Sequence, residues 1–87
     1  MYIILVYDVG QKRVGKVCKY LRTMLHWIQN SVFEGDLTEA QLDRMRQRLC
    51  RLIDEEEDAV LIYRVSSSKW VEREAIGIEK NPRTNLL

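Results

Sequence analysis

The first residues of the chain are apolar on both sides of an extended segment. Its side chains alternate between two sets, one of Tyr2, Ile4 and Val6 and the other of Ile3, Leu5 and Tyr7. A strand over residues 2–8 with two apolar faces needs cover on both sides of its sheet. The lone carboxylate of Asp8 ends this strand, and the short turn Val9-Gly10-Gln11 follows it.

Apolar residues at helical spacing predict two helices. The first covers residues 12–25 and has a core stripe of Val14, Val17, Cys18, Leu21, Met24 and Leu25. The second begins at Thr38, where Thr38-Glu39-Ala40-Gln41 has the form of a capping box. Its predicted buried stripe is Leu42, Met45, Leu49, Leu52 and Ile53.

The remaining segments favour extended structure. Residues 27–37 are typical of two short antiparallel strands, with the turn at either Gln29-Asn30 or Glu34-Gly35. Residues 59–65 predict a further core strand, and Ser66-Ser67-Ser68 predicts a turn or hinge. Residues 69–78 alternate weakly and suggest a last strand, whereas we expect a flexible tail over 79–87.

The resulting order, β-α-β-β-α-β, is that of the ferredoxin-like α+β fold, in which two helices cover one face of an antiparallel sheet. We expect a single domain over residues 1–78, with 66–78 as a C-terminal extension. The other face of the first strand is then uncovered, and a second copy packing sheet against sheet is the simplest cover. A chain of 87 residues buries only roughly 60–65% of its unfolded surface, which gives a marginal core. Pairing as a homodimer would bury further apolar surface. The extension is a candidate to pair with the partner's sheet.

Composition narrows the class of protein. The 46% apolar and 31% charged residues are typical of a soluble globular domain, and no run approaches the ~18 apolar residues of a membrane span. The N-terminus has no basic segment typical of a signal peptide. Cys18 and Cys50 lack metal-ligand spacing, so we expect reduced core residues in a cytoplasmic protein, with a disulfide or zinc site as the alternative. His26, at a helix-to-strand junction, is interpreted as structural.

The net charge of +1 hides a separation of positive from negative residues. The first helix carries basic residues and no acid: Lys12, Arg13, Lys16, Lys19 and Arg22. The second helix has a similar row of Arg44, Arg48 and Arg51. Such rows are either solvated helix surfaces or contacts for a phosphate backbone, which carry no base specificity. The acidic run 54–58 is interpreted as a solvated loop.

Asp8 is the main candidate for chemistry. An acid at a strand end beside a cationic surface suits binding or hydrolysis of a phosphodiester. Because Mg²⁺ prefers octahedral oxygen ligands and keeps several waters, one carboxylate holds it weakly, and a second copy of the chain would supply another. The alternative is that Asp8 caps the helix that follows it.

Three segments together are similar to the CRISPR-associated protein 2 family. They are Tyr7-Asp8-Val9, the basic first helix and Ile28-Gln29-Asn30-Ser31-Val32-Phe33-Glu34-Gly35. The resemblance covers roughly residues 1–65 and continues weakly to 78, and the family's fold agrees with the predicted element order. The turn Val9-Gly10-Gln11 is shorter than is usual in the family, and Trp27 stands where a basic residue is common.

The resemblance implies a function. Family members are homodimers that act in spacer acquisition beside the CRISPR integrase subunit, and several are described as metal-dependent endonucleases on RNA or DNA. It implies that Asp8 binds Mg²⁺ or another divalent cation as the catalytic residue, and that Tyr7, Ser31 and Phe33 occupy other motif positions. Two such carboxylates at about 5 Å would repel by roughly 3 kcal/mol at an effective dielectric of 20, which a shared cation would relieve. The alternative is a non-catalytic subunit that holds duplex DNA for the integrase.

Overall fold

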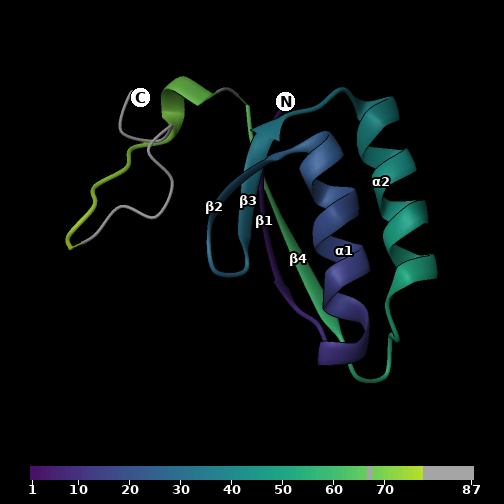
Figure 1. Cartoon of the computed structure of the whole chain (residues 1–87). Coiled ribbons are helices and arrows are strands. Elements are labelled where there is room, and N and C mark those ends of the chain that lie inside the picture. Colours follow the sequence, from purple (N-terminus) through teal and green to yellow (C-terminus); the bar gives the residue numbers. More distant parts are fainter. Residues whose placement is uncertain (67, 78–87) are drawn as a thin grey trace.

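The order of helices and strands is the predicted one. The structure, a computed structural model, describes residues 1–66 and 68–77. The elements are β1 (Tyr2–Asp8), α1 (Gln11–Met24), β2 (His26–Gln29), β3 (Val32–Asp36), α2 (Glu39–Leu52), β4 (Ala59–Val65) and a short 3-10 helix, η1 (Ser68–Trp70) (Figure 1).

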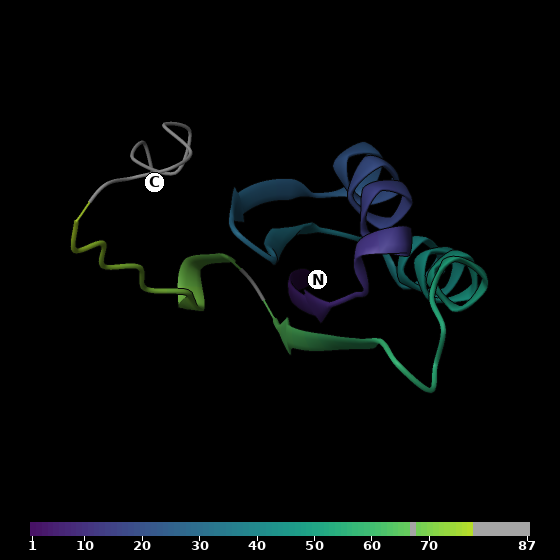
Figure 2. The ribbon, with the colours of Figure 1, turned by 60° about the horizontal axis from the view of Figure 1, so that its bottom comes forward.

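The strands form one antiparallel sheet in the order β2-β3-β1-β4. The central strand β1 pairs with β3 from Tyr2 opposite Asp36 to Val6 opposite Val32. On its other edge β1 pairs with β4 along its full length, ending at Asp8 opposite Ala59. Both helices lie on the same side of this sheet, as Figure 2 shows. The predicted ferredoxin-like architecture is therefore confirmed.

The core lies between the sheet and the two helices. Alternate side chains of β1 are buried, because one face of the strand meets the helices and the other does not. The fully buried large side chains come from all these elements: Phe33, Ile3, Leu5, Leu21, Leu42, Met45 and Val17. The apolar stripes predicted for the helices thus form the interior.

The two helices begin in different ways. The Thr38 hydroxyl accepts a hydrogen bond from the Gln41 amide at 3.1 Å, and the Gln41 side chain accepts one from the Thr38 amide at 2.8 Å. The predicted capping box of α2 is therefore present. By contrast, α1 begins after Gly10, which offers no side-chain cap. The Arg13 and Val14 amides donate to the Gly10 carbonyl, at 2.9 and 3.0 Å.

The turn between β2 and β3 lies at Asn30 and Ser31. Asn30 has a φ of 43°, a left-handed conformation that asparagine tolerates better than most residues. This agrees within one residue with the first predicted turn. The alternative, Glu34-Gly35, lies inside β3, and Gly35 is buried there against Leu25.

In the single chain, the described part of the last strand predicted over residues 69–78 is not formed, and the pairing of this segment with a partner's sheet stays a prediction. Ser68–Trp70 form η1, and residues 71–77 make no ladder with any strand of the sheet. A strand needs a hydrogen-bonding neighbour, and this segment crosses to the side of the sheet opposite the helices instead (Figure 2). Residue 78 and the tail predicted over 79–87 lie outside the described residues.

The cysteines are free, as predicted, but only one of them packs against the core. Cys18 is partly buried and contacts the core cluster. The expectation that Cys50 is a core residue is wrong, since its side chain is exposed. At 3.6 residues per turn, Cys50 lies about 100° around the helix from the centre of the buried stripe. Within the described residues, neither helix is long and apolar enough to cross a membrane.

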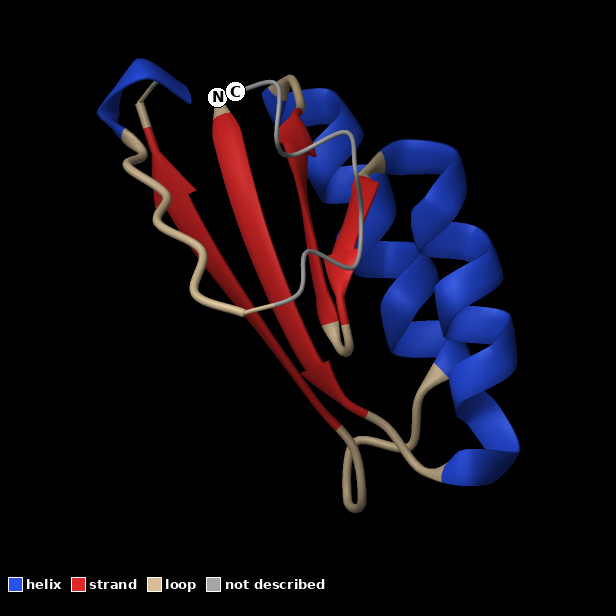
Figure 3. Cartoon of the chain, turned by 60° about the vertical axis from the view of Figure 1, so that its left-hand side comes forward, coloured by secondary structure: helices blue, strands red, loops and turns tan. Residues whose placement is uncertain are grey.

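Across residues 1–66 and 68–77, no helix covers the second face of the sheet, which we call the open face (Figure 3). Tyr2, Ile4 and Val6 of β1 point toward it, and the neighbouring Leu61 and Tyr63 of β4 are 56% and 55% exposed. One buried acid lies on this face. Glu34 accepts a hydrogen bond from the Tyr2 hydroxyl at 2.5 Å and forms an ion pair with Arg73 of the C-terminal segment.

Candidate metal and nucleic-acid site around Asp8

Asp8 is an exposed residue at the end of the central strand. In the strand alternation it shares the open face with Ile4 and Val6. Among the described residues, no hydrogen bond or ion pair engages its carboxylate. The N-cap of α1 is Gly10, so the alternative in which Asp8 caps this helix is wrong. The Asp8 oxygens are therefore available to an external ligand.

The turn after Asp8 is held by a carboxylate from a distant loop. Asp58 Oδ1 accepts hydrogen bonds from the Gly10 amide at 2.8 Å and from Arg13 Nη2 at 2.9 Å. Asp58 Oδ2 accepts bonds from Arg13 Nε at 2.5 Å and from the Asp54 amide at 2.8 Å. We call Gly10, Arg13 and Asp58 the turn clamp. It joins the β1–α1 turn to the loop before β4.

Charge pairing explains why the clamp tolerates burial. The Asp58 side chain has 0% exposure, and a buried carboxylate is stable only when it is paired and hydrogen-bonded. The hydrogen bonds from Arg13, above all, hold the pKa of the Asp58 carboxyl well below its usual range, and the Asp54 and Gly10 amides act in the same direction. In turn, the bond to Asp58 raises the pKa of the Arg13 guanidinium. Both groups are charged at neutral pH.

Glycine at position 10 leaves room for the clamp. A Cβ atom built on Gly10 would lie 2.7 Å from Arg13 Nη2, which is closer than real contacts allow. Arg13 therefore reaches Asp58 by passing directly over the backbone of Gly10. Its Nη2 also contacts Glu57 at 3.1 Å.

Sequence reasoning missed Asp58, because it treated the acidic run 54–58 as a solvated loop. That interpretation is right for the exposed residues 54–57 and wrong for Asp58. One feature of the sequence points to it, because Asp58 is the acid that directly precedes the strand predicted over residues 59–65.

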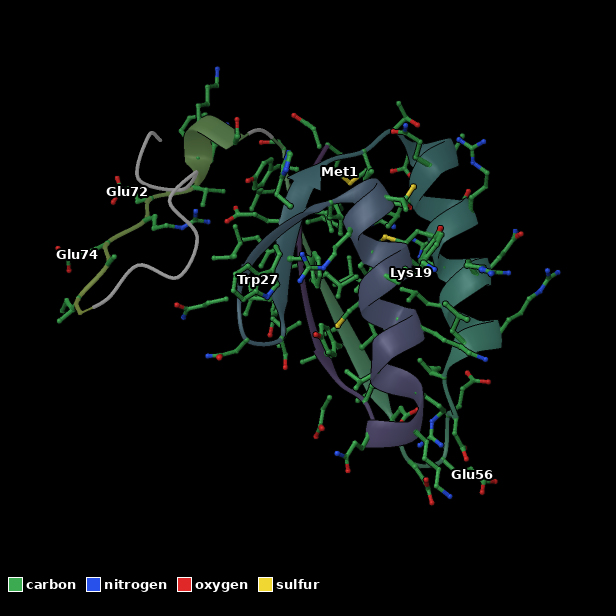
Figure 4. The ribbon with its side chains drawn as sticks, viewed as in Figure 1. Met1, Lys19, Trp27, Glu56, Glu72 and Glu74 are labelled. Atoms are coloured by element: carbon green, nitrogen blue, oxygen red, sulfur yellow. The ribbon has the colours of Figure 1, made fainter. Side chains whose placement is uncertain are left out.

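The predicted cations of α1 divide into two groups. Lys12, Lys16, Lys19 and Arg22 are exposed, and we call them the α1 ridge. Arg13 is only partly exposed, and its guanidinium is engaged in the turn clamp. Figure 4 shows Lys19 on the helix layer, whereas Glu72 and Glu74 lie on the C-terminal segment on the other side of the sheet. Within the described part of the chain, no ion pair engages the side chains of the α1 ridge.

The second row of cations lies beside the first. Arg44, Arg48 and Arg51 are exposed on α2, and we call them the α2 ridge. The Arg48 guanidinium lies 6.0 Å from the ring centre of Tyr20, which belongs to α1. This contact brings the α2 ridge next to α1 on the helix layer. We call the two ridges together the cationic surface.

Asp8 and the cationic surface lie on different sides of the chain. Asp8 shares the open face of the sheet, whereas the ridges lie on the exposed sides of the helices. One chain therefore does not combine them into a single cleft. A ligand that touched both would have to pass around the end of the sheet where β1 leads into α1.

The other motif positions, Tyr7, Ser31 and Phe33, meet behind Asp8 on the helix side of the sheet. The Tyr7 amide donates to the Ser31 carbonyl at 3.1 Å, and the Tyr7 and Phe33 rings lie 6.1 Å apart. The Tyr7 hydroxyl contacts Cys18 Sγ at 2.8 Å. Burial, followed by this contact, raises the pKa of Tyr7 to about 12. Tyr7 therefore stays protonated at neutral pH and supports the strand end from the core.

The single chain offers one carboxylate to a metal ion. The described residues hold no group of three or more His, Cys, Asp or Glu arranged for metal binding. His26 lies on β2 opposite Glu34, which in turn lies opposite Ile4 of β1. Asp8 is therefore two strands across and four residues along the sheet from His26, a separation of roughly 15 Å. An unpartnered carboxylate suits Mg²⁺, which prefers oxygen ligands and retains waters. The donor set fits a site completed by a second chain.

Comparison with known families settles the relationship of the chain. The family model described as CRISPR associated protein Cas2 matches residues 1–73, which include every strand and helix of the sheet domain. The chain belongs to the Cas2 family.

Similar Cas2 proteins match along the whole chain. A relative from Pyrococcus furiosus is 54% identical, with all of both chains covered. A relative from Methanothermobacter thermautotrophicus is 51% identical over all of this chain and 96% of its own. Both are named CRISPR-associated endoribonuclease Cas2.

Solved structures agree with the fold. A crystal structure of a Cas2 protein has a TM-score of 0.87 and 48% identity, covering 94% of this chain and 92% of that one. Streptococcus pyogenes Cas2 has a TM-score of 0.73 and 30% identity, covering 86% of this chain and 100% of that one. In this chain, Asp8, the turn clamp and the cationic surface are therefore placed on a Cas2 fold.

Proposed function

We propose that the chain is a metal-dependent endoribonuclease whose site is completed when two copies pair through their open faces. The observation that carries this proposal is the Asp8 carboxylate. It is exposed at the end of β1, it faces the open side of the sheet, and no described residue engages it. The names of the relatives, CRISPR-associated endoribonuclease, support RNA as the substrate.

The open face supports the homodimer. Leu61 and Tyr63 are more than half exposed beside Ile4 and Val6, so a monomer leaves a contiguous apolar surface in water. A second copy offers an identical apolar face, and a two-fold axis would pair this patch with the same patch of the partner. The proposal places the axis at the Asp8 end of the face, because only residues close to a two-fold axis meet their own equivalents.

In this arrangement the residues have distinct tasks. The two Asp8 carboxylates would hold a Mg²⁺ ion, which when bound supplies an acidic water and a polarised phosphoryl oxygen. The apolar faces would exclude bulk water around the carboxylates and strengthen their interaction with cations. His26 is too remote to act as a general base. We therefore expect slow hydrolysis.

The test is cleavage of RNA by the wild type and Asp8→Asn, expressed and purified in parallel. Each protein is incubated with single-stranded RNA and with duplex DNA, in Mg²⁺ and in chelator. We expect wild-type cleavage only with Mg²⁺ and no cleavage by Asp8→Asn. Equal activity in the two proteins would identify a contaminating nuclease and contradict the proposal.

A second function is favoured by a different observation, the cationic surface on the helices. The α1 and α2 ridges are exposed and lie away from Asp8, as expected for a subunit that holds a nucleic-acid backbone without cutting it. Such a homodimer would bridge duplex DNA for the CRISPR integrase during spacer acquisition. In that case Asp8→Asn would leave both DNA binding and spacer acquisition unchanged, which distinguishes the scaffold from the nuclease.

A further inference from the structure

We propose that Asp58 is a positioning residue for Asp8, acting through the turn clamp. The inference rests on the proposed function, because it assigns Asp58 the task of holding the metal-binding carboxylate in place. Asp58 itself touches neither metal nor RNA. Its side chain is fully buried and all of its contacts are internal.

The turn clamp lies directly beside Asp8. Asp8 is paired with Ala59 in the last rung of the β1–β4 ladder. Gly10 follows Asp8 by two residues, and Asp58 directly precedes Ala59. The hydrogen bond from the Gly10 amide to Asp58 therefore closes a small ring just beyond that rung, with Val9 as the one residue between Asp8 and the clamp. Asp8 is fixed on one side by the ladder and on the other by the clamp.

Helix capping does not account for this arrangement. A serine, threonine or asparagine at position 10 would cap α1 by accepting from the amides of its first turn. Asp58 instead accepts from the amide of Gly10, the N-cap residue itself, and it comes from 48 positions along the chain. The distant acceptor does what a local cap does not, because it ties the exit of β1 to the entry of β4.

The hydrogen bonds to Asp58 fix its carboxylate by their number and direction. Arg13 binds both oxygens of Asp58 through Nε and Nη2, so the carboxylate plane is fixed by a two-pronged contact. The Asp54 amide fixes Oδ2 from the other side. These donors hold the Asp58 carboxylate in one orientation. The Gly10 amide, which donates to the same carboxylate, is therefore held in place as well. A flexible turn would instead let Asp8 sample several directions and weaken a shared metal site.

The test measures Mn²⁺ binding by the full-length protein, with Mn²⁺ as the paramagnetic probe for the Mg²⁺ site. The variants are Asp58→Asn, which removes the charge, and Arg13→Lys, which keeps the positive charge but loses the two-pronged contact. Residues that orient a metal ligand typically contribute 10–100-fold to affinity, so we expect each variant to bind Mn²⁺ about 10-fold more weakly. Amide exchange at Gly10 should become faster in the same variants.

Two controls separate positioning from general stability. Leu42→Ala removes a buried side chain of α2 that has no part in the clamp, and Asp43→Asn breaks the exposed ion pair with Arg46. All proteins are compared at a temperature below their own unfolding transitions. We expect both controls to bind Mn²⁺ as the wild type does, although Leu42→Ala unfolds at a lower temperature.

The outcomes are distinct. Wild-type Mn²⁺ affinity in Asp58→Asn and Arg13→Lys, with affinity lost in Asp8→Asn, would overturn the positioning role and leave the proposed function standing. Equal weakening in Leu42→Ala would also overturn it, since the effect would then follow stability. Unchanged Mn²⁺ binding in Asp8→Asn would instead overturn the proposed function, and the positioning role with it.

Discussion

At the scale of single residues, two aspartates near the end of β1 have opposite environments. Asp8 is exposed and has no partner among the described residues, whereas Asp58 is buried and accepts bonds on both oxygens. The difference decides their chemistry. A free carboxylate is available to a cation, and a saturated one acts as a structural anchor.

The buried pair makes stability depend on pH. The pKa of Asp58 is lowered in the folded protein, mainly by its bonds from Arg13, so its contribution is present above the ordinary aspartate pKa and is lost as the pH falls. We expect Asp58→Asn to melt at a lower temperature than the wild type at pH 7. The difference in melting temperature between the two proteins should narrow below about pH 4, where the carboxylate of the unfolded chain begins to take up protons. Thermal melts from pH 7 to pH 3 measure this. A difference in melting temperature that stays constant over this pH range would contradict the account.

Asp8 could be singled out from the sequence and Asp58 could not, for a physical reason. Asp8 interrupts a continuous apolar strand, so its position alone makes it conspicuous. Asp58 is the last of several consecutive acids, and only the folded chain shows that Arg13, 45 positions away, meets this one. For the same reason Arg13 looked like one more cation of the first helix. Contacts between distant residues are not visible in local spacing.

At the scale of elements, α1 and α2 each combine an apolar stripe with an exposed basic row. The stripes fix how the helices pack on the sheet, and the rows then lie together on the outside. Local patterns predicted these elements correctly, including the capping box of α2. They failed for the segment after β4, because whether an alternating segment forms a strand depends on a neighbour that the sequence does not name.

The α1 ridge predicts the salt dependence of nucleic-acid binding. Each neutralised phosphate contributes roughly 0.9 to the slope of log affinity against log salt concentration. Replacing Lys12, Lys16 and Lys19 by Ala should therefore reduce that slope by about 2.7 for each protomer in contact with duplex DNA. Fluorescence anisotropy at several salt concentrations measures it. Arg46→Ala is the control, because Arg46 is paired with Asp43. An unchanged slope in the triple variant would remove the ridge from the interface.

At the scale of the whole molecule, the main feature is a sheet with one covered face and one open face. The helices cover the first, and of the residues that the structure describes only those after β4 reach the second, where Arg73 pairs with Glu34 (Figure 3). The sequence predicted this asymmetry, since β1 is apolar on both sides and the fold supplies helices to one. The proposed homodimer follows from the need to cover the other.

A charge on the open face should separate the two copies. We expect the wild type to sediment as a dimer at micromolar concentration and Leu61→Glu to sediment as a monomer, because a dimer would bury the new carboxylates without partners. Gln47→Glu adds the same charge on the exposed side of α2 and should leave the dimer intact. A wild-type monomer, or a dimer that survives Leu61→Glu, would contradict pairing through the open face.

The central claim is that two Asp8 carboxylates share one metal ion across a homodimer. Calorimetric titration of the wild type and Asp8→Asn with Mn²⁺ tests this claim most directly, because it reports the number of ions bound to each chain. The account predicts one ion for every pair of wild-type chains and no binding by Asp8→Asn. One ion for each chain, or equal binding by both proteins, would contradict it.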